Sequence, residues 1–262
     1  MTKTFGDVTA SVNGEQVGIA EIRRPPDNFF DAELIGSLAD SFEWLDEHGT
    51  RAIVLCSEGK HFCAGADFTG RSEHARRIGA AGGASELYDQ ALRLFEAPVP
   101  VIAAVQGAAV GGGLGLACAA DFRVASPRSR FSANFARIGL HQGFALSATL
   151  PAIIGQQRAT DLLCTGRRVG GEEAARLGLA DRLAEDDSAL RGAAVEYATE
   201  IASAAPLAVR SIRATMRAGL ADLARAAMER ELAEQQKLWP TEDFAEGVRA
   251  AAERRAARFT GR

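Results

Sequence analysis

The sequence predicts an α/β protein whose sheets are covered by helices. Two short runs, residues 52–56 and 101–105, are apolar at every position, as is typical of strands that are buried on both faces. Segments with helical periodicity lie between such runs, and this alternation is typical of α/β folds. With 262 residues, 47% of them hydrophobic, the chain is long enough to bury a substantial core.

The first predicted elements are a hairpin and a helix. Residues 9–13 and 17–23 are predicted strands that are joined by a turn at Gly14. Asp31 is a suitable helix cap, and the helix that follows it is predicted to end near Gly49. The apolar face of this helix comprises Leu34, Ile35, Leu38, Phe42 and Leu45.

The middle of the chain contains a strand–turn–helix unit. A Gly- and Ala-rich polar stretch, residues 70–83, precedes this unit and is expected to be mobile. The unit consists of a strand at 101–105, a Gly-rich turn at 107–113 and a helix at 114–119, and another strand is predicted at 122–125. Repetition of such ββα units favours one continuous α/β core.

The remainder of the chain, from Phe144 onward, is predicted to be mainly helical. Pro206 stands at a predicted first helical turn, where proline is favoured. The helices are predicted at residues 172–177, 189–203, 206–217, 221–238 and 242–258. No sharp linker is evident, so we divide the chain into an α/β core at 1–200 and a C-terminal helical region at 201–262. That region is too small to fold alone and is expected to pack on the core or on another subunit.

Composition and charge narrow the classes of partner. The net charge of −4 gives no reason to expect a nucleic acid, although a local positive patch can still bind an anionic small molecule. The most apolar segment, residues 99–120, is interrupted by Gly107 and a Gly triplet, so no membrane span is expected. The first residues resemble neither a signal peptide nor a transit peptide. We therefore expect a cytoplasmic protein without a membrane partner.

The cysteine pattern indicates neither a disulfide framework nor a metal site. The cysteines are widely spaced, form no CxxC pair and have no histidine at zinc-ligand spacing. They are Cys56, Cys63, Cys118 and Cys164. Each lies in apolar or Gly/Ala-rich surroundings, so we expect buried free thiols and no bound metal.

Two loops carry the strongest functional signal. The segment 106–115, with the sequence QGAAVGGGLG, brings a strand into three consecutive glycines at the start of a helix. Glycines let the backbone approach a ligand, and the helix N-terminus favours negative charge there. The segment 61–67, HFCAGAD, follows the strand at 52–56 and contains the small residues Gly65 and Ala66. Each loop alone is best interpreted as a tight turn, but together they indicate an oxyanion hole.

These segments resemble the two signature stretches of the crotonase, or enoyl-CoA hydratase/isomerase, superfamily. HFCAGADF and VQGAAVGGGLGLACAADFRVAS match the signatures, and further similarity extends over nearly the whole chain. The resemblance implies a crotonase-like spiral of ββα repeats with a helical C-terminal trimerisation region. It also implies a homotrimer or a dimer of trimers, with an acyl-CoA thioester as substrate. Coenzyme A would be part of that substrate, and no other cofactor is expected.

The resemblance also assigns residues to the site. The thioester carbonyl would lie between two backbone amides that map onto Ala66 and Gly112. Threading of the pantetheine chain between the loops implies substrate contacts from Ala64, Gly65, Asp67, Phe68 and Gly111. The Asp67 side chain is expected to cap the following turn. Arg24 is one of the cations considered for the CoA phosphates, and a solvated surface arginine is the alternative.

The chain departs from the family at both glutamates that hydratases use for general acid–base catalysis. The first position is Gly115 and the second is Phe135. An aspartate that some isomerases and dehalogenases carry on the next loop is replaced by Gly143. The departures argue against hydration by the usual mechanism of the family.

The loop around Gly143 offers other candidates. His141 can act as an acid or base near neutral pH, and a loop histidine bonded to backbone is the alternative. Gln142 and, less strongly, Asn134 can position water or a polar substituent. Phenylalanines near these loops hint at an apolar pocket, although such residues are more often part of the core. They are Phe29, Phe30, Phe135 and Phe144.

The sequence thus leaves several functions open. The leading hypothesis is an isomerase or lyase of acyl-CoA metabolism, for example of fatty acids, that stabilises an enolate for isomerisation, decarboxylation or other non-hydratase chemistry. A catalytically quiet acyl-CoA-binding homologue and a CoA-independent hydrolase of carbon–carbon bonds in diketones are the alternatives. A dinucleotide site is disfavoured because Leu116 stands where G-x-G-x-x-G needs its last glycine. A serine nucleophile is disfavoured because no serine occurs between Gly107 and Ala125.

Overall fold

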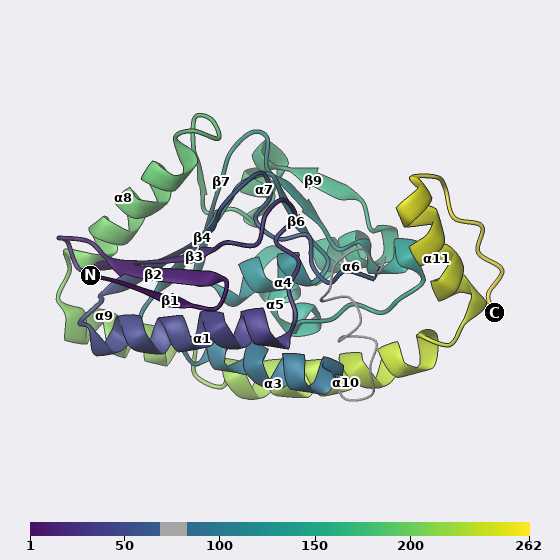
Figure 1. The fold of residues 1–262 in the computed structure, drawn as a ribbon, viewed down its shortest axis with the longest axis horizontal. Coiled ribbons are helices and arrows are strands. Elements are labelled where there is room, and N and C mark those ends of the chain that lie inside the picture. The colour runs from purple at the N-terminus through teal and green to yellow at the C-terminus, as the bar shows by residue number, and fades with distance from the viewer. Residues whose placement is uncertain (69–82) are drawn as a thin grey trace.

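A seven-stranded sheet forms the centre of the computed structural model, which describes residues 1–68 and 83–262 (Figure 1). Apart from Gly83, the stretch 70–83 lies outside the described residues, so its expected mobility stays a prediction. The strands of the large sheet lie in the order β1-β2-β3-β4-β5-β7-β10. They are β1 (Thr2–Phe5), β2 (Val8–Val12), β3 (Val17–Ile22), β4 (Ala52–Ser57), β5 (Val101–Val105), β7 (Phe122–Ala125) and β10 (Arg182–Leu183).

The large sheet is antiparallel at one end and parallel over the rest. Strands β1, β2 and β3 pair antiparallel, which confirms the predicted hairpin, and the strands from β3 to β10 pair parallel. Strand β4 is buried along its whole length, as its apolar sequence predicts. The parallel strands deliver the ends of β4 and β5 to the same edge, and both predicted functional loops begin there.

A second sheet lies beside that edge and contains three short strands. They are β6 (Ala108–Val110), β8 (Arg130–Ser132) and β9 (Arg168–Gly170), in the order β6-β8-β9. Strands β5 and β6 and helix α4 (Gly112–Ala119) form the predicted strand–turn–helix unit. An isolated bridge joins Cys63 to Ala109, so the first functional loop is attached to the second through this sheet.

Helices cover both faces of the large sheet (Figure 1). Helix α1 (Ala32–Glu47) begins as predicted at Asp31, whose carboxylate accepts a hydrogen bond from the Leu34 amide at 2.9 Å. Helix α1 packs on α3 (Gly83–Phe95), and α3 packs on α10 (Leu220–Leu238), on the side where the main core lies. Helix α8 (Leu190–Ala202) covers the other side, and its Leu190, Ala194 and Ala198 pack in a second core.

The remaining helices are η1 (Asn134–Ile138), α5 (Leu146–Ile154), α6 (Gln156–Thr165), α7 (Gly171–Leu177), α9 (Pro206–Met216) and α11 (Glu242–Glu253). Of these, α7, α9 and α11 were predicted, whereas the 3₁₀ helix η1 and the helices α5 and α6 had no predicted bounds. Helix α11 ends at Glu253, five residues before the predicted end. Arg254 is left-handed with φ 56°, and the carboxylate of Glu246 accepts hydrogen bonds from the Arg255 side chain and the Arg258 amide. These contacts turn the chain back and stop the helix.

The four cysteines are free thiols, as predicted, but they differ in exposure. Cys56, Cys63 and Cys118 are buried, and burial raises the thiol pKa of Cys56 and Cys63 to about 12 and that of Cys118 to about 11. Cys164 is exposed, so the expectation of burial is wrong at this position. It lies in the amphipathic helix α6, in which the described buried residues are Ala159 and Leu162. None of the helices in the described ranges is long and apolar enough to cross a membrane.

Candidate active site

The two Gly-rich loops are held against each other by backbone hydrogen bonds. The Cys63 amide donates to Ala108 O, and the Cys63 carbonyl accepts from the Val110 amide, both at 3.0 Å. Gly65 lies two residues after Cys63 with φ 83°, and a Cβ at Gly65 would lie 2.7 Å from Val110 O. Only glycine therefore suits both the conformation and the close approach at this position.

Where the loops meet, the amides of Ala66 and Gly112 have no hydrogen-bond acceptor within residues 1–68 and 83–262. Gly112 is the first residue of α4, where a helical N–H has no partner within the helix. The neighbouring Gly111 amide, by contrast, donates to Ser132 O at 2.8 Å. The positive end of α4 adds to the field at the amides of Ala66 and Gly112, so negative charge is favoured there.

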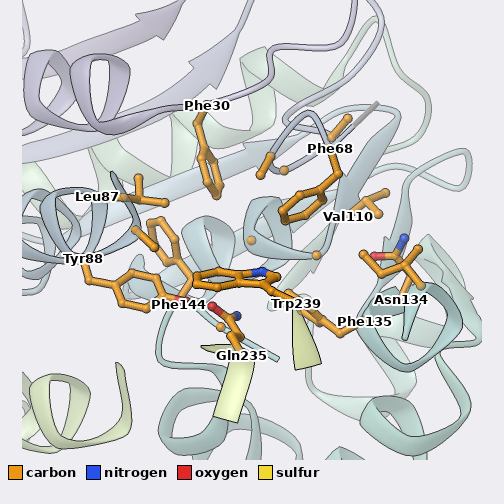
Figure 2. A pocket seen from close by; sticks show the side chains of 18 residues that line it. Phe30, Phe68, Leu87, Tyr88, Val110, Asn134, Phe135, Phe144, Gln235 and Trp239 are labelled. Atoms are coloured by element: carbon orange, nitrogen blue, oxygen red, sulfur yellow. Dashed lines mark hydrogen bonds between the residues drawn. The ribbon is translucent and has the colours of Figure 1, made fainter. Parts of the chain in front are cut away.

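A mainly apolar cavity of about 80 Å³ lies next to these amides (Figure 2). Six aromatic side chains line it together with small residues of both loops. Of the predicted site residues, the following line the cavity: Ala64, Gly65, Ala66, Phe68, Gly111, Gly112, Asn134 and Phe135. Phe30 and Phe144, whose rings lie 5.3 Å apart between centroids, also contribute, which agrees with the apolar pocket expected from the sequence.

Three of the predicted site residues lie outside the lining of this cavity. Asp67 is buried. His141 is half-buried, and its Nδ1 lies 2.9 Å from the carbonyl oxygen of Gln142. The Gln142 side chain donates to Ser147 Oγ at 3.0 Å. These contacts are those of a loop whose side chains bond locally, and the role of His141 stays a prediction that mutation must decide.

The positions of the two absent glutamates are occupied by apolar groups. A Cβ placed at Gly115 would lie 2.5 Å from the Cβ of Phe144 and 3.0 Å from its ring. Phe135, at the second position, is itself part of the cavity wall. The site therefore has no room for a carboxylate at the first position. At the second position an aromatic ring stands where hydratases have a glutamate.

The third variable position, Gly143, is filled from elsewhere in the chain. A Cβ at Gly143 would clash with the hydroxyl of Tyr88 from α3 and would lie 2.7 Å from Nε2 of Gln235 from α10. Both side chains line the cavity, as does Trp239 (Figure 2). Sequence reasoning missed all three because Tyr88 and Gln235 lie on helices and Trp239 caps the end of α10. Helical periodicity indicates a buried face without showing what that face contacts.

The electrostatics of the cavity are unusual for an acid–base site. No Asp, Glu, Lys, Arg or His is found among the described residues that line it, and Tyr88 is the one titratable side chain in that set. Burial, and next the charge of Glu231, raises the pKa of Tyr88 above its ordinary value of 10.0, while a side-chain hydrogen bond with Gln235 and a backbone one with Phe144 lower it. Tyr88 is therefore a neutral phenol at physiological pH.

A strained loop turns the chain from Gly143 into α5. Phe144 and Ala145 both have positive φ, 60° and 58°, which is costly for residues with side chains. The fully buried carboxylate of Glu231 accepts from the amides of Ala145 at 2.9 Å and Ser147 at 2.8 Å. Burial raises the pKa of Glu231, and hydrogen bonds from the loop act against that rise. Glu231 thus fixes the loop that places Phe144 in the cavity.

The arginine considered for CoA phosphates is engaged within the fold. Arg24 forms ion pairs with Asp7 at 2.7 Å and Asp31 at 3.1 Å, and its side chain is 12% exposed. It helps to fix the start of α1, and we assign it no phosphate contact.

The cavity is mainly apolar, and two of the amides at its edge have no acceptor among the described residues. Such an arrangement is typical of proteins that stabilise an oxyanion on a bound carbonyl group. The family model for enoyl-CoA hydratase/isomerase matches residues 13–262. The chain therefore belongs to the enoyl-CoA hydratase/isomerase, or crotonase, family.

Relatives cover the chain almost completely. The chain is similar to an enoyl-CoA isomerase/hydratase of Zymoseptoria tritici, with 33% identity over 282 residues that cover 100% of the chain and 89% of the relative. It is also similar to the cyclohexa-1,5-dienecarbonyl-CoA hydratase of Thauera aromatica, with 33% identity over 246 residues and 92% of each chain covered.

Solved structures confirm the predicted crotonase-like fold. The enoyl-CoA hydratase/isomerase of Pseudoalteromonas atlantica T6c superimposes with a TM-score of 0.83 at 30% identity, covering 97% of this chain and 100% of that one. An enoyl-CoA hydratase of Streptomyces coelicolor, described as putative, gives a TM-score of 0.71 at 33% identity, covering 100% and 97%.

Proposed function

We propose that the protein is an acyl-CoA isomerase or lyase that stabilises a thioester enolate between the amides of Ala66 and Gly112. The observation that carries this proposal is the pair of amides, Ala66 and Gly112, that line the cavity and have no acceptor in the described part of the chain. The two positions of the hydratase glutamates are Gly115 and Phe135. Two amides aimed at one oxygen stabilise an oxyanion by several kcal/mol in a site that excludes water. The named relatives act on, or are classed with enzymes of, acyl-CoA thioesters, which supports this substrate class.

The reaction is proposed to be isomerisation, decarboxylation or another enolate reaction. Syn-hydration needs a carboxylate to hold water and move its protons. The described lining of the cavity offers no carboxylate, and Phe144 closes the space at Gly115. No cofactor beyond the CoA of the substrate enters this proposal. The proposed compartment is the cytoplasm, and the proposed role is in acyl-CoA metabolism such as that of fatty acids.

The test is a mass-spectrometric screen of purified protein against short, branched, aromatic and malonyl-type acyl-CoA thioesters. Cyclic diketones are included because a CoA-independent hydrolase is an alternative that uses the same oxyanion hole. The proposal expects turnover of at least one thioester, with loss of turnover in Ala66→Pro. Turnover of diketones alone would replace the proposal by the hydrolase, and tight thioester binding without turnover would replace it by the quiet homologue.

We also propose that the protein assembles as a homotrimer or a dimer of trimers. The support is a set of large apolar side chains exposed on α9 and at the start of α10: Leu207, Ile212, Met216 and Leu223. Exposure of several such residues on neighbouring turns is typical of an association surface. Light scattering coupled to size-exclusion chromatography should give three or six chains for the wild type and fewer for Ile212→Glu. A monomeric wild type would contradict the proposal.

A further inference from the structure

The cavity carries a polar pair that the enolate chemistry does not use. The hydroxyl of Tyr88 donates to Oε1 of Gln235 at 3.2 Å, and both side chains line the cavity beside Phe144 and Trp239 (Figure 2). The absence of a side chain at Gly143 is what leaves room for them. Buried polar groups in a ligand pocket usually fix the orientation of the ligand.

The amide of Gln235 has a fixed orientation. Its Nε2 donates to the carbonyl oxygens of His141 and Gln142, both at 3.2 Å. Because these carbonyls can only accept, Oε1 is held toward Tyr88 and remains an acceptor. Tyr88, a neutral phenol, is the matching donor. The pair therefore presents one donor and one acceptor side by side, which is what a single hydroxyl group needs.

The charges around the pair exclude an ionised substituent. The buried carboxylate of Glu231 lies close enough to act on Tyr88, and no cation is found among the described lining residues. A carboxylate at this place would be desolvated, unpaired and repelled by Glu231. A neutral oxygen substituent meets no such penalty.

The shape of the cavity favours a flat group. The rings of Phe30, Phe68, Phe135, Phe144 and Trp239 surround it together with Tyr88. Aromatic walls of this kind offer offset-stacked and edge-to-face contacts to another ring. An acyl group that fills the cavity is therefore expected to be cyclic and planar or nearly so.

We propose that Tyr88 and Gln235 form a subsite for a neutral hydroxyl group, and that the substrate is the CoA thioester of a hydroxylated aromatic or cyclic unsaturated acid. The ring hydroxyl accepts from Tyr88 and donates to Oε1 of Gln235. The part of this proposal that makes the substrate a CoA thioester rests on the proposed function. The hydroxyl subsite itself does not require CoA.

The first experiment measures the binding of matched thioesters by calorimetry. Phenylacetyl-CoA is compared with each monohydroxyphenylacetyl-CoA isomer and with a carboxyphenylacetyl-CoA. Because Tyr88 and Gln235 bond to each other without ligand, the hydroxyl exchanges bonds, and roughly three- to tenfold tighter binding is expected for at least one isomer. Tyr88→Phe keeps the ring and should reduce this preference to less than about twofold.

The chain supplies a matched control, because Tyr197 is the second of its two tyrosines. Tyr197 packs on Phe122 in the second core, away from the cavity. Tyr197→Phe should keep the hydroxyl preference unchanged. The proposal is overturned if no hydroxylated isomer is preferred, if the preference survives in Tyr88→Phe, or if the carboxylated ring binds best.

A second experiment separates the subsite from the thioester chemistry. Phenol and toluene, which differ little in size, are compared by ligand-detected NMR with the wild type and Tyr88→Phe. If thioesters fail to bind but phenol is preferred through Tyr88, the subsite stands and the proposed function falls. If thioesters bind but neither experiment shows a hydroxyl preference, the subsite falls and the proposed function stands. If the protein shows no preference for phenol and binds no thioester, both are overturned.

Discussion

The two walls of the cavity are built from different kinds of group. One wall is backbone: the amides of Ala66 and Gly112, placed by the ends of parallel strands and by the start of α4. The rest of the cavity wall is made of side chains, among them Phe135, Phe144 and the Tyr88–Gln235 pair. The first wall matches the family signatures, whereas the second departs from the family at each of the three positions where carboxylates occur.

This contrast separates the groups that would activate the carbonyl group of the substrate from those that would determine the product. Polarisation of a carbonyl group depends on backbone amides that every residue except proline possesses, so it persists as long as the loop geometry does. The fate of the enolate depends on side chains that can donate or accept protons, and these change without disturbing the backbone. Substitutions at the two walls should therefore have different consequences.

The largest effect is expected from removing one amide of the backbone wall. Ala66→Pro deletes the N–H while Gly65, the preceding residue, tolerates the backbone that proline demands. Turnover of the thioester found in the screen should fall by about 10²–10³-fold, the usual cost of losing one oxyanion-hole donor. Rates are measured on folded variant, verified by circular dichroism. Turnover within a few-fold of wild type would show that Ala66 is not a donor.

A smaller effect is expected from forcing a glutamate back into the side-chain wall. Gly115→Glu should lower the free energy of unfolding by about 1–3 kcal/mol because its side chain meets Phe144 in a packed core. Hydratase activity should not appear.

Urea denaturation in a Phe144→Ala background tests the cause of that loss. The cost of Gly115→Glu should be clearly lower there, since the interfering ring is gone. An equal cost in both backgrounds would mean that Phe144 is not what closes the position.

A comparable loss of stability is expected from changing Glu231, which fixes the loop that carries Phe144. Glu231→Gln replaces one acceptor oxygen by an NH₂ group that faces the amide of Ala145 or Ser147, which should cost about 1–3 kcal/mol of unfolding free energy. Because the pKa of Glu231 is raised in the folded state, its contribution is fully present below its ordinary value of 4.5 and is lost as the pH rises through the raised value. The gap between wild type and variant should therefore narrow with rising pH in urea titrations. A gap that widens would contradict the assigned direction of the shift.

The smallest effect is expected from His141→Ala. Its imidazole does not line the cavity, so turnover should change by less than about twofold. The pH–rate profile of the same variant is the more sensitive measurement. Collapse of turnover, or loss of a titration near neutral pH, would establish His141 as the acid–base group that the sequence suggested.

Local signals made much of the fold and one wall predictable. The hairpin β2–β3, the cap at Asp31 and the Gly triplet each depend on neighbouring residues, and the structure places them as predicted. Strand β1 was missed because it is a short, mostly exposed edge strand with little apolar pattern. The end of α11 was missed because contacts made by Glu246, outside any helical pattern, stop it.

The other wall was beyond sequence reasoning for a geometric reason. Tyr88 and Gln235 are 147 residues apart and meet only because α3 packs against α10. The apolar periodicity of these helices predicts a buried face, but it does not predict that this face borders a cavity. Likewise, Gly115 and Phe135 showed that the glutamates are absent, whereas the filling of that space by Phe144 required the positive-φ turn that Glu231 holds.

Helix α10 joins these regions along one stripe of side chains. Ala224 and Met228 lie in the core, Glu231 holds the loop, and Gln235 and Trp239 face the cavity. Successive members are three or four residues apart, so they share one face, and at 1.5 Å per residue the stripe is about 22 Å long. A related protein could keep both signature loops, and so be recognised as a family member, while different side chains on this face of α10 accept a different acyl group. Substrate specificity can therefore change through α10, which lies outside the signature motifs by which the family is identified.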